Sequence, residues 1–445
     1  MSPLRPTSMP MLLVATVITA TPTVGLFAQE GSPGGPVPQS LLSARRARLV
    51  ESLGGRLALI GADHLKDIES EYPQDSDFRQ NADFFYLTGL EEPEGWLVLN
   101  AGGPGAVVLY LMPRDPANET WTGRRLGPGP EASRISGIED VRSMSRFDED
   151  LAGWLELEAN VVLSLGDERN RSAVRAPFER AGVVAEAAAP LLARLRMIKD
   201  EDEIRRLGRA IEITMEAQRE AWRVAESGVF EYEIEAAIEY VFRAGGAERV
   251  GFPSIVASGP NTTTLHYDKN RRRTRTGDLL LVDIGAEFGY YTADITRTAP
   301  VSGTFTARQR ELYELVLGAQ EAGIAAVRPG SNIGVAHQAA VRHLERNSGD
   351  LCGQRSCSAY FIHSLSHWLG MDVHDVGGVL TPFEPGMVLT VEPGIYLPDE
   401  ELGIRIEDVV LVTEAGHEVL SAALARDPDE IEAVMGEPPR WVRSR

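Results

Sequence analysis

The amino-acid sequence predicts an α+β protein of two domains, in which an α/β domain precedes a larger domain of helices and antiparallel strands. The chain has 445 residues, a length sufficient for two or three domains. Short apolar runs bounded by Gly, Pro or Asp, which are typical of strands, recur through residues 43–190. Amphipathic helices alternate with strands over residues 191–435, which leaves residues 436–445 as a C-terminal tail.

The first residues are typical of an export signal. Arg5 provides a weakly basic start, and Met11–Ala28 is an apolar stretch diluted by Thr and Pro that ends in a small residue suited to cleavage. This stretch is too short and too polar for a convincing membrane span, so no stable membrane insertion is expected. We expect a signal peptide over residues 1–28, a flexible leader over residues 29–42 and an exported protein. The alternative is a disordered cytoplasmic tail.

The first domain, residues 43–190, is predicted to be α/β from its apolar runs. A helix is expected around Ser43–Leu53. The strand-length runs are Leu57–Ile60, Trp96–Leu99, Val107–Leu111 and Val161–Leu165. This half contains no cluster of candidate ligands, so the reactive groups are expected in the second domain.

A change of pattern at Pro190 marks the start of the second domain. Apolar residues recur at helical spacing through Asp200–Ala225, and a second amphipathic helix stops at Gly245 and Gly246. Three further elements are predicted: a strand over Asp278–Ile284, a helix opened by a capping box at Thr306–Gln309, and a helix from Ser331 to Gly349.

The charge balance argues against a nucleic-acid partner. The chain carries 44 Lys and Arg against 65 Asp and Glu, a net charge of -21. Such a surface repels phosphate backbones, so nucleic-acid binding is not expected.

The chain has two cysteines, Cys352 and Cys357. Two thiols cannot form a structural zinc site alone, and no activating base nearby indicates a nucleophile. In an oxidising compartment they would close a small loop as a disulfide, the alternative being two inert thiols.

Two aspartates lie in apolar runs that flank a turn near Phe288 and Gly289. If the turn is tight, Asp283 and Asp294 lie opposite each other on one face of a hairpin. A bare carboxylate inside an apolar strand is costly, so a capping role is less favoured than metal binding. The spacing suits two cations held close together.

A second pair of carboxylates follows the same pattern. Two strand-like runs are joined by the polar segment 398–403, and reflection about its centre places Glu392 opposite Glu407. Pro393 cannot donate to the ladder, so the strand is interrupted just after Glu392. Arg405 shares a face with Glu407 and could orient it, or it could form a plain structural ion pair.

Three of the eight histidines lie in one short stretch: His363, His367 and His374. Their apolar neighbours and Gly370 favour a site in which one histidine is a ligand and the others donate protons or hydrogen bonds. Composition alone does not decide which is the ligand. With the four acids, one imidazole completes a donor set suited to two divalent cations.

The ordered motifs of the second half resemble the pita-bread metallopeptidases, and among them the Xaa-Pro aminopeptidase (aminopeptidase P) family. The matching segments are Val282–Gly285, Ala293–Thr298, His363–Asp375, Thr390–Tyr396 and Ile404–Asp408. Residues 77–89 also resemble the first domain of that family, and the likeness runs from about residue 43 to 435. The resemblance implies a creatinase-like α/β N-terminal domain and a pita-bread catalytic domain.

The resemblance also implies a role for each site residue. Asp283 would bind one ion, His367 and Glu392 the other, and Asp294 and Glu407 would bridge both. The two ions are expected to be manganese, although cobalt, iron or zinc would also be accepted. The remaining catalytic residues implied are His266, His363 and His374, which would bind substrate, with Glu392 as the proton shuttle. Arg405, inferred above from its place on the strand, completes the expected catalytic set.

The function implied is hydrolysis of the Xaa-Pro bond at the N-terminus of peptides by a hydroxide shared between the two ions. The alternative is an Xaa-Pro dipeptidase (prolidase) with the same metals but a site closed beyond the second residue. The expected partners are peptides with proline in second position, and family members are often homodimers or homotetramers.

Overall fold

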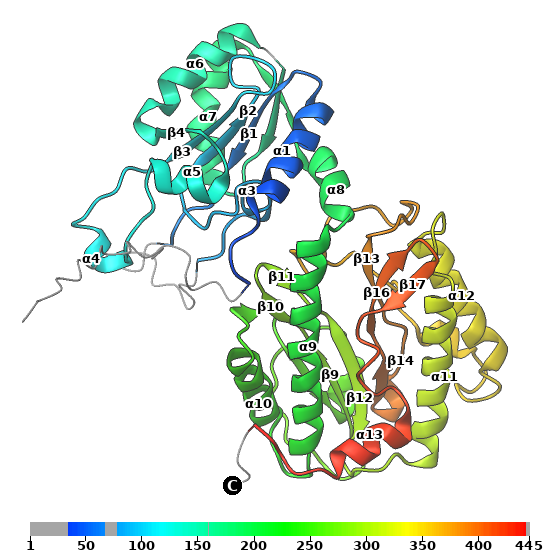
Figure 1. Ribbon diagram of the computed structural model, residues 1–445. Coiled ribbons are helices and arrows are strands. Elements are labelled where there is room, and N and C mark those ends of the chain that lie inside the picture. Colours follow the sequence, from blue (N-terminus) through cyan, green and yellow to red (C-terminus); the bar gives the residue numbers. More distant parts are fainter. Residues whose placement is uncertain (1–33, 67–77, 159, 442–445) are drawn as a thin grey trace, which may run out of the picture.

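The structure, a computed structural model, describes residues 34–66, 78–158 and 160–441. The chain forms two domains, with the N-terminal domain at the top of Figure 1 and the second domain below it. Helix α8 (Ala189–Met197) leads from one to the other. The predicted signal peptide and the first part of the leader, through residue 33, lie outside the described residues. Within the described ranges, no helix combines the length and the apolar character needed to cross a bilayer.

A mixed six-stranded sheet forms the centre of the N-terminal domain, in the order β4-β3-β2-β1-β5-β6. Its strands are β1 (Leu57–Gly61), β2 (Trp96–Leu99), β3 (Val107–Leu111), β4 (Asp140–Ser143), β5 (Asn160–Ser164) and β6 (Val184–Ala187). The four predicted strands are confirmed as β1, β2, β3 and β5. The sequence did not predict the two edge strands β4 and β6, because neither is fully buried and neither forms a long apolar run.

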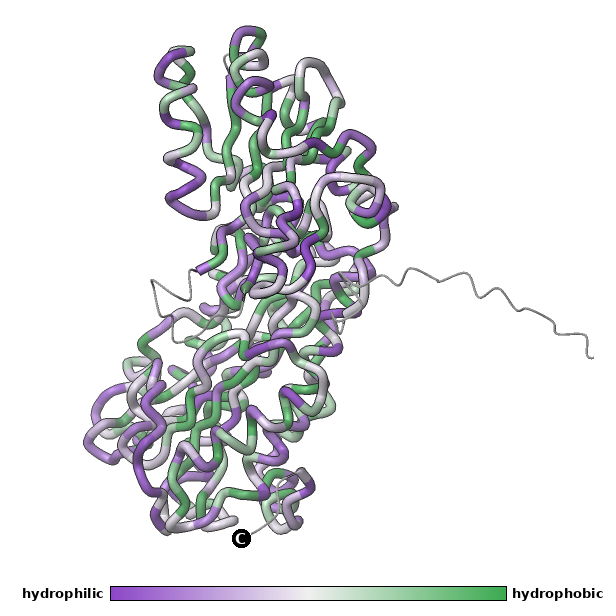
Figure 2. The backbone as a smooth tube through the Cα atoms, turned by 90° about the vertical axis from the view of Figure 1, so that its left-hand side faces the viewer, coloured by the Kyte–Doolittle hydropathy of each residue, from purple (hydrophilic) through white to green (hydrophobic). Residues whose placement is uncertain are grey.

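Helices cover both faces of this sheet, so its inner strands are apolar on both sides. The helices are α1 (Gln39–Leu53), α3 (Ala82–Thr88), α4 (Glu119–Thr122), α5 (Pro130–Ser136), α6 (Phe147–Leu157) and α7 (Glu168–Ala181). Leu42 of α1 packs in one core with Ile60, whereas Phe147 of α6 packs in a second core with Leu59. Figure 2 shows hydrophobic segments of the chain running through the interior of the molecule.

Helix α1 begins inside the predicted leader of residues 29–42. The helix begins at Gln39, and Val37 and Leu42 are buried. The carbonyl oxygens of Gly34 and Gly35 accept hydrogen bonds from Arg205 and Arg206. Residues 34–42 therefore pack on the protein, and the predicted leader extends too far.

Five helices surround the strands of the second domain. They are α9 (Glu201–Val224), α10 (Glu231–Ala244), α11 (Ala307–Ala325), α12 (Ile333–Asn347) and α13 (Pro428–Met435). The predicted helices match α9, α10, α11 and α12, and the capping box between Thr306 and Gln309 is present. Helix α9 packs against β9 and β12, while α11 packs against β13, β14 and β15 (Figure 1).

The strands of this domain form small antiparallel sheets, in the orders β11-β10-β7, β12-β9-β8, β13-β16-β17 and β14-β15. They are β7 (Arg249–Val250), β8 (Ile255–Ser258), β9 (Leu279–Ile284), β10 (Ala286–Phe288), β11 (Tyr291–Thr292), β12 (Ile295–Pro300), β13 (Val388–Val391), β14 (Gly394–Leu397), β15 (Leu402–Arg405), β16 (Asp408–Thr413) and β17 (Gly416–Val419). A fully buried ion pair between Arg297 and Asp408 connects β12 to β16.

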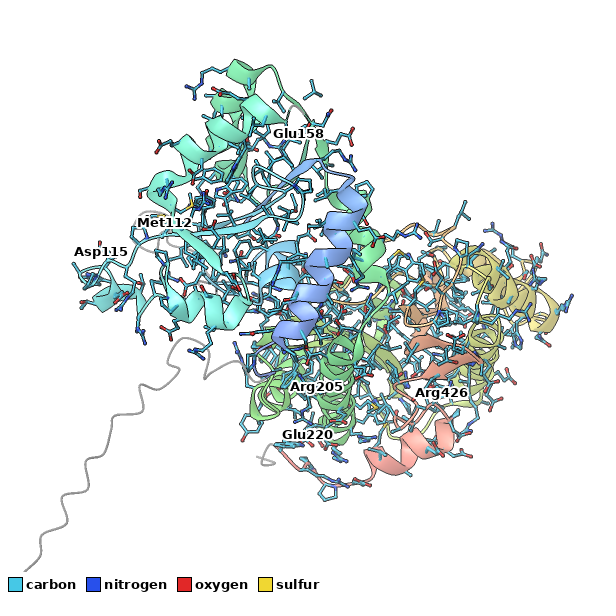
Figure 3. All side chains as sticks on the ribbon, turned by 45° about the horizontal axis from the view of Figure 1, so that its top comes forward. Met112, Asp115, Glu158, Arg205, Glu220 and Arg426 are labelled. Atoms are coloured by element: carbon cyan, nitrogen blue, oxygen red, sulfur yellow. A yellow bond between two sulfur atoms is a disulfide. The ribbon has the colours of Figure 1, made fainter. Side chains whose placement is uncertain are left out.

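The end of the chain packs on α9. The backbone N–H groups of Arg440 and Trp441 donate to the carboxylate of Glu220, which Figure 3 labels near the lower end of the molecule. The predicted tail from residue 436 is therefore attached to the second domain, at least through residue 441.

The two domains meet at the turn of the β10–β11 hairpin. Tyr290, in this turn, stacks on Phe85 of α3 with ring centroids 3.7 Å apart. Its hydroxyl oxygen also accepts a hydrogen bond from the backbone N–H of Gln80 at 3.0 Å. The hairpin turn is thus fixed against the N-terminal domain.

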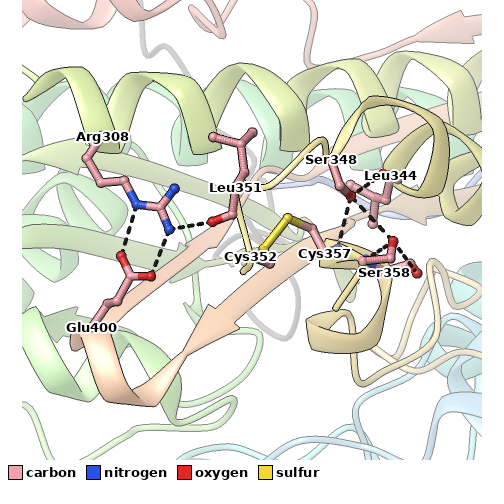
Figure 4. The surroundings of a disulfide bond; sticks show 9 residues. Arg308, Leu344, Ser348, Leu351, Cys352, Cys357, Ser358 and Glu400 are labelled. Carbon is pink, nitrogen blue, oxygen red and sulfur yellow. Dashed lines mark hydrogen bonds and ion pairs between the residues drawn. A yellow bond between two sulfur atoms is a disulfide. The ribbon is translucent and has the colours of Figure 1, made fainter. Parts of the chain in front are cut away.

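Cys352 and Cys357 form a disulfide, as Figure 4 shows. The bridge lies between α12 and the short helix η3 (Cys357–Tyr360). Arg308 connects this loop to the next hairpin, because its guanidinium donates to the carbonyl oxygen of Leu351 at 2.6 Å and to Glu400 at 2.7 Å. Glu400 belongs to the turn η4 (Pro398–Glu400) between β14 and β15.

Replacement of both cysteines, Cys352→Ala with Cys357→Ala, should lower the free energy of unfolding by about 2 kcal/mol. The reason is that the crosslink restricts a short loop in the unfolded chain. Urea unfolding of the variant and of the wild type measures the difference. Addition of a thiol reductant should shift the wild type to the variant's midpoint and leave the variant unchanged; an equal shift in both proteins would contradict this account.

Candidate metal centre

The first pair of predicted ligands lies on the hairpin that contains β9, β10, β11 and β12. Asp283 pairs with Thr296, and the same register carries on to Phe288 opposite Tyr291. The predicted direct opposition of Asp283 and Asp294 is therefore wrong by two residues. Asp294 is instead the diagonal neighbour of Asp283 on the same face, still within reach of its side chain.

The turn explains this shift of register. Gly289 and Tyr290 both have positive φ, at 57° and 72°, as a two-residue hairpin turn of the right twist requires. The hairpin is therefore centred one residue later than the sequence analysis assumed. Glycine at 289 was a visible signal, but a tyrosine with positive φ at 290 could not be expected.

The second pair lies on the ribbon formed by β13–β14 and β15–β16. Val391 pairs with Asp408, and Gly394 pairs with Arg405. Continuation of this register places Glu392 opposite Glu407, which confirms the predicted alignment. Both acids lie at a break between strands, where the backbone N–H groups turn to other partners: that of Glu392 donates to Leu365 and that of Glu407 to Thr296.

Two buried glutamines support these hairpins from opposite sides. Gln218 of α9 donates to the carbonyl oxygens of Val282 and Ile295, the neighbours of Asp283 and Asp294, at 3.0 and 2.8 Å. Gln320 of α11 donates in the same way to Val391 and Ile406, the neighbours of Glu392 and Glu407, at 3.2 and 3.1 Å. Both glutamine side chains are fully buried.

Neither glutamine is predicted from the sequence. A glutamine in an amphipathic helix is usually a surface residue, and nothing in the local pattern marks these two as different. Each one bridges two backbone segments at the point where a pair of acids projects.

The imidazole of His367 lies against the acids. Its Nε2 is 3.3 Å from Asp294 Oδ2 and 3.4 Å from Glu392 Oε1. Its Nδ1 lies 3.1 Å from the carbonyl oxygen of Trp368, so Nδ1 is assigned the proton and the lone pair of Nε2 faces the carboxylates. This is the tautomer that a metal-binding histidine requires.

The donor atoms fit a divalent cation. One ligand atom each of Asp294, His367 and Glu407 lies within 4.8 Å of the other two. Asp283, Asp294 and Glu407 each also have a buried carboxylate oxygen that accepts no hydrogen bond from the described residues. A buried oxygen of this kind is normally satisfied, so three of them converging on one point match a site for hard cations.

Burial of these acids perturbs their protonation. The pKa of Glu407 is raised to about 8, first by burial and then by the charge of Asp283. Burial and the neighbouring carboxylates also raise the pKa of Asp294 and of Glu392 well above the ordinary value. Burial lowers the pKa of His367 to about 4, so its ring is neutral at physiological pH. Ionisation of all these acids is therefore unfavourable without a counter-charge, and the site favours a bound cation.

Arg405 does not contact Glu407 as the sequence analysis considered. Its guanidinium donates to Asp283 Oδ2 at 2.5 Å and to the hydroxyl of Tyr396 at 2.9 Å. A threonine mediates between Arg405 and Glu407: Thr296 Oγ1 accepts from Arg405 and donates to Glu407 at 2.7 Å. Arg405 therefore orients Asp283 directly and Glu407 through Thr296.

A cavity of about 530 Å³ opens above the acids and brings the remaining predicted residues together. All nine predicted site residues line this cavity: His266, His363 and His374 lie beside the five candidate ligands and Arg405. His363 Nε2 contacts the hydroxyl of Tyr396 at 2.8 Å. Tyr396, which the sequence analysis did not single out, thus connects a substrate-facing histidine to Arg405.

Much of the remaining wall is apolar, although Asp268, Ser364 and Ser366 also line it. Phe252, Pro253, Ile255 and Leu265 line it together with Val373. A pocket with charged donors at its base and hydrocarbon on its sides can hold a molecule that has both a polar end and a compact apolar ring. Two domains, one of which holds a carboxylate-rich centre at the bottom of such a cavity, define a metal-dependent hydrolase.

Comparison with known proteins agrees with this class. The aminopeptidase P N-terminal domain matches residues 42–163, and metallopeptidase family M24 matches residues 205–414. The Xaa-Pro aminopeptidases of Escherichia coli and Haemophilus influenzae are 37% and 34% identical, over 88% and 90% of this chain and 96% and 98% of their own lengths. The structure of Pseudomonas aeruginosa aminopeptidase PepP matches with a TM-score of 0.83 at 35% identity, covering 90% of this chain and 98% of that one.

The chain therefore belongs to metallopeptidase family M24, in its aminopeptidase P branch. The predicted fold, a pita-bread domain preceded by an N-terminal α/β domain, is confirmed. The matched ranges are compatible with the predicted domain boundaries, which remain predictions.

The stability of the metal-free protein should fall as the pH rises from 6.5 to 8. Glu407 has a folded-state pKa of about 8 against 4.5 ordinarily, so its contribution to stability is complete below pH 4.5 and is lost as the pH rises through 8. The lowered pKa of His367 acts in the opposite sense, but only below pH 6.5. Thermal unfolding of chelator-treated protein at each pH measures the trend.

Glu407→Gln serves as the control for this pH dependence. The loss above pH 6.5, at most about 1.4 kcal/mol per pH unit for each proton, should become shallower in the variant because an amide does not ionise. Addition of a divalent cation should raise the melting temperature of the wild type more at pH 8 than at pH 6.5. A metal-free wild type that gains stability over this range would contradict the electrostatic account.

Proposed function

We propose that the protein is a metal-dependent aminopeptidase that removes the first residue from peptides with proline in second position. The observation that carries this proposal is the convergence of four carboxylates and His367 at the base of a cavity whose walls are partly apolar. The relatives named Xaa-Pro aminopeptidases, which align over most of the chain, support the choice of substrate.

Two divalent cations are proposed as the cofactor, with manganese as the metal. Asp283, Asp294, His367, Glu392 and Glu407 would hold them. When bound, such ions polarise a carbonyl group and make water a stronger nucleophile at neutral pH. The support is the donor chemistry: oxygen ligands with one imidazole suit manganese and also admit cobalt, iron or zinc.

The protein's own residues would position the peptide and move protons. His266, His363 and His374 line the cavity, where they would contact the substrate. Glu392 Oε2 lies 3.9 Å from His363, at the edge of the acid cluster. Burial and Glu407 raise the pKa of Glu392, and Glu392 is the residue proposed to accept a proton and return it to the leaving amine.

The apolar wall supplies a reason for proline. The pyrrolidine ring is compact and lacks an N–H donor, so it can lie against Phe252, Pro253 and Leu265 without leaving an unpaired polar group. An Xaa-Pro dipeptidase with the same metals is the second candidate. The named relatives favour the aminopeptidase.

Asp294→Ala should lower kcat for an Xaa-Pro-Xaa tripeptide at least about a thousandfold, because it removes a carboxylate proposed to contact both cations. Protein stripped of metal and reloaded with manganese is to be assayed on this tripeptide and on the Xaa-Pro dipeptide side by side. The matched control is Asp399→Asn, an exposed acid on the β14–β15 turn, which should retain wild-type activity.

Cleavage of the dipeptide alone would replace the aminopeptidase with the dipeptidase. Activity that survives both complete chelation and Asp294→Ala would exclude the proposed metal chemistry. Isothermal titration of both variants with manganese separates loss of metal from loss of fold.

Export and a homodimeric or homotetrameric state are also proposed. The Cys352–Cys357 disulfide supports an oxidising compartment. Expression of the full chain in a bacterial host and sequencing of the mature N-terminus should show cleavage after Ala28 and recovery from the periplasm or medium. Full-length protein confined to the cytoplasm would contradict export, and light scattering decides the oligomeric state.

A further inference from the structure

The loop between His367 and Gly378 carries two histidines of the site, one near each end. The loop is closed on itself, because the backbone N–H of Asp375 donates to the carbonyl oxygen of Trp368 at 3.0 Å. The Trp368 indole also donates to the carbonyl oxygen of Gly378 at 3.3 Å. The ring centroids of His367 and His374 lie 4.4 Å apart across this closed loop.

The ring of His374 lines the cavity. Its position therefore depends on the groups that fix the backbone next to it. The next residue, Asp375, points the other way and is buried. Its Oδ1 accepts from Arg196 Nη2 at 2.6 Å and its Oδ2 accepts from Lys199 Nζ at 3.2 Å. The side chains of Lys199 and Asp375 are each 1% exposed, so this ion pair is shielded from water.

The use of lysine at this point is unusual for the chain. The sequence contains three lysines, Lys66, Lys199 and Lys269, and arginine supplies all other basic side chains. Lys199 is therefore an exception, and the available space explains it. A Cβ atom at Gly370 would lie 2.0 Å from Asp375 Oδ2 and 3.1 Å from Lys199 Cε, so the main chain packs tightly around the pair.

The same cluster reaches the N-terminal domain. Arg196 also donates to Asp83 of α3 at 2.8 Å and to Asp372 of the loop at 2.8 Å. From the same domain, Arg79 donates to the carbonyl oxygen of Met371 at 2.6 Å. The outer side of the loop is thus held by charged groups from both domains, while its inner side presents His374 to the cavity.

We propose that Asp375, held by Lys199 and Arg196, is the positioning residue that fixes His374 in the substrate cavity. A buried carboxylate with two cationic partners has one favourable position. Because His374 is the preceding residue, the same contacts also fix its backbone. The part of this proposal that concerns substrate rests on the proposed peptidase function. The part that concerns the position of His374 does not.

Lys199→Met tests the proposal by kinetics. With manganese bound and an Xaa-Pro-Xaa peptide as substrate, kcat should fall about tenfold to a hundredfold, the usual effect of displacing a site group by about an ångström. Manganese affinity should stay within about threefold of wild type, because none of the five candidate ligands contacts Lys199. Asp375→Asn, which keeps the shape and removes the charge, is the second variant should the first fail to fold.

A double-mutant cycle separates positioning from a general loss of structure. If Lys199 acts through His374, then Lys199→Met should change kcat less than about twofold in a His374→Ala background. Multiplicative losses in the double variant would overturn the proposal. The matched control is Arg223→Met, which removes another buried ion pair, that between Arg223 and Glu220 of α9. This variant should lower stability without lowering kcat.

A second readout does not need catalysis. Histidine-ring NMR signals of the zinc-loaded protein, with His374 assigned through His374→Ala, should show a displaced His374 resonance in Lys199→Met and Asp375→Asn. The resonance of His417, on β17, should not move. An unmoved His374 signal would overturn the positioning role. If the signal is displaced but the wild-type protein does not cleave Xaa-Pro peptides, the positioning role stands and only the proposed function is rejected.

Discussion

The site depends on one constraint: two antiparallel hairpins must present their acids toward each other, and three of the four acids, Asp294, Glu392 and Glu407, lie where the strands are interrupted. An uninterrupted ladder would pair the backbone groups of every residue within the sheet and would not by itself bring the carboxylates together. Gln218 and Gln320 take up the carbonyl groups beside those acids from helices on opposite sides. Four carbonyl groups beside the acids are therefore paired, and the two hairpins can meet with their acids inward.

The convergence of the acids creates an electrostatic problem that the surrounding residues solve only in part. Arg405 offsets the charge of Asp283, and Thr296 satisfies one oxygen of Glu407. No comparable cation reaches Asp294 among the described ion pairs except the ring of His367, which is neutral at physiological pH. The protein has therefore left the centre short of positive charge, and bound cations would supply it.

Most of this centre could be predicted from the sequence because its acids lie in apolar strand-like segments, where an unpaired charge is costly and indicates a bound partner. The Glu392 and Glu407 alignment was correct because Pro393 and the polar turn define the hairpin centre. The Asp283 and Asp294 alignment was displaced because a tyrosine takes a left-handed turn position at 290. Gln218, Gln320 and Lys199 could not be predicted, since their importance comes from what they touch across the fold and not from their sequence neighbours.

The stacking of Tyr290 on Phe85 has a consequence for how this protein could change over evolution. The hairpin whose tip rests on the first domain is the same hairpin that bears Asp283 and Asp294 near its base. An exchange of the first domain for that of a distant homologue would therefore remove this support of the hairpin unless the new domain also placed an aromatic ring against Tyr290. The two halves would therefore have to change together, and they also share one hydrophobic cluster, which contains both Leu42 and Leu207.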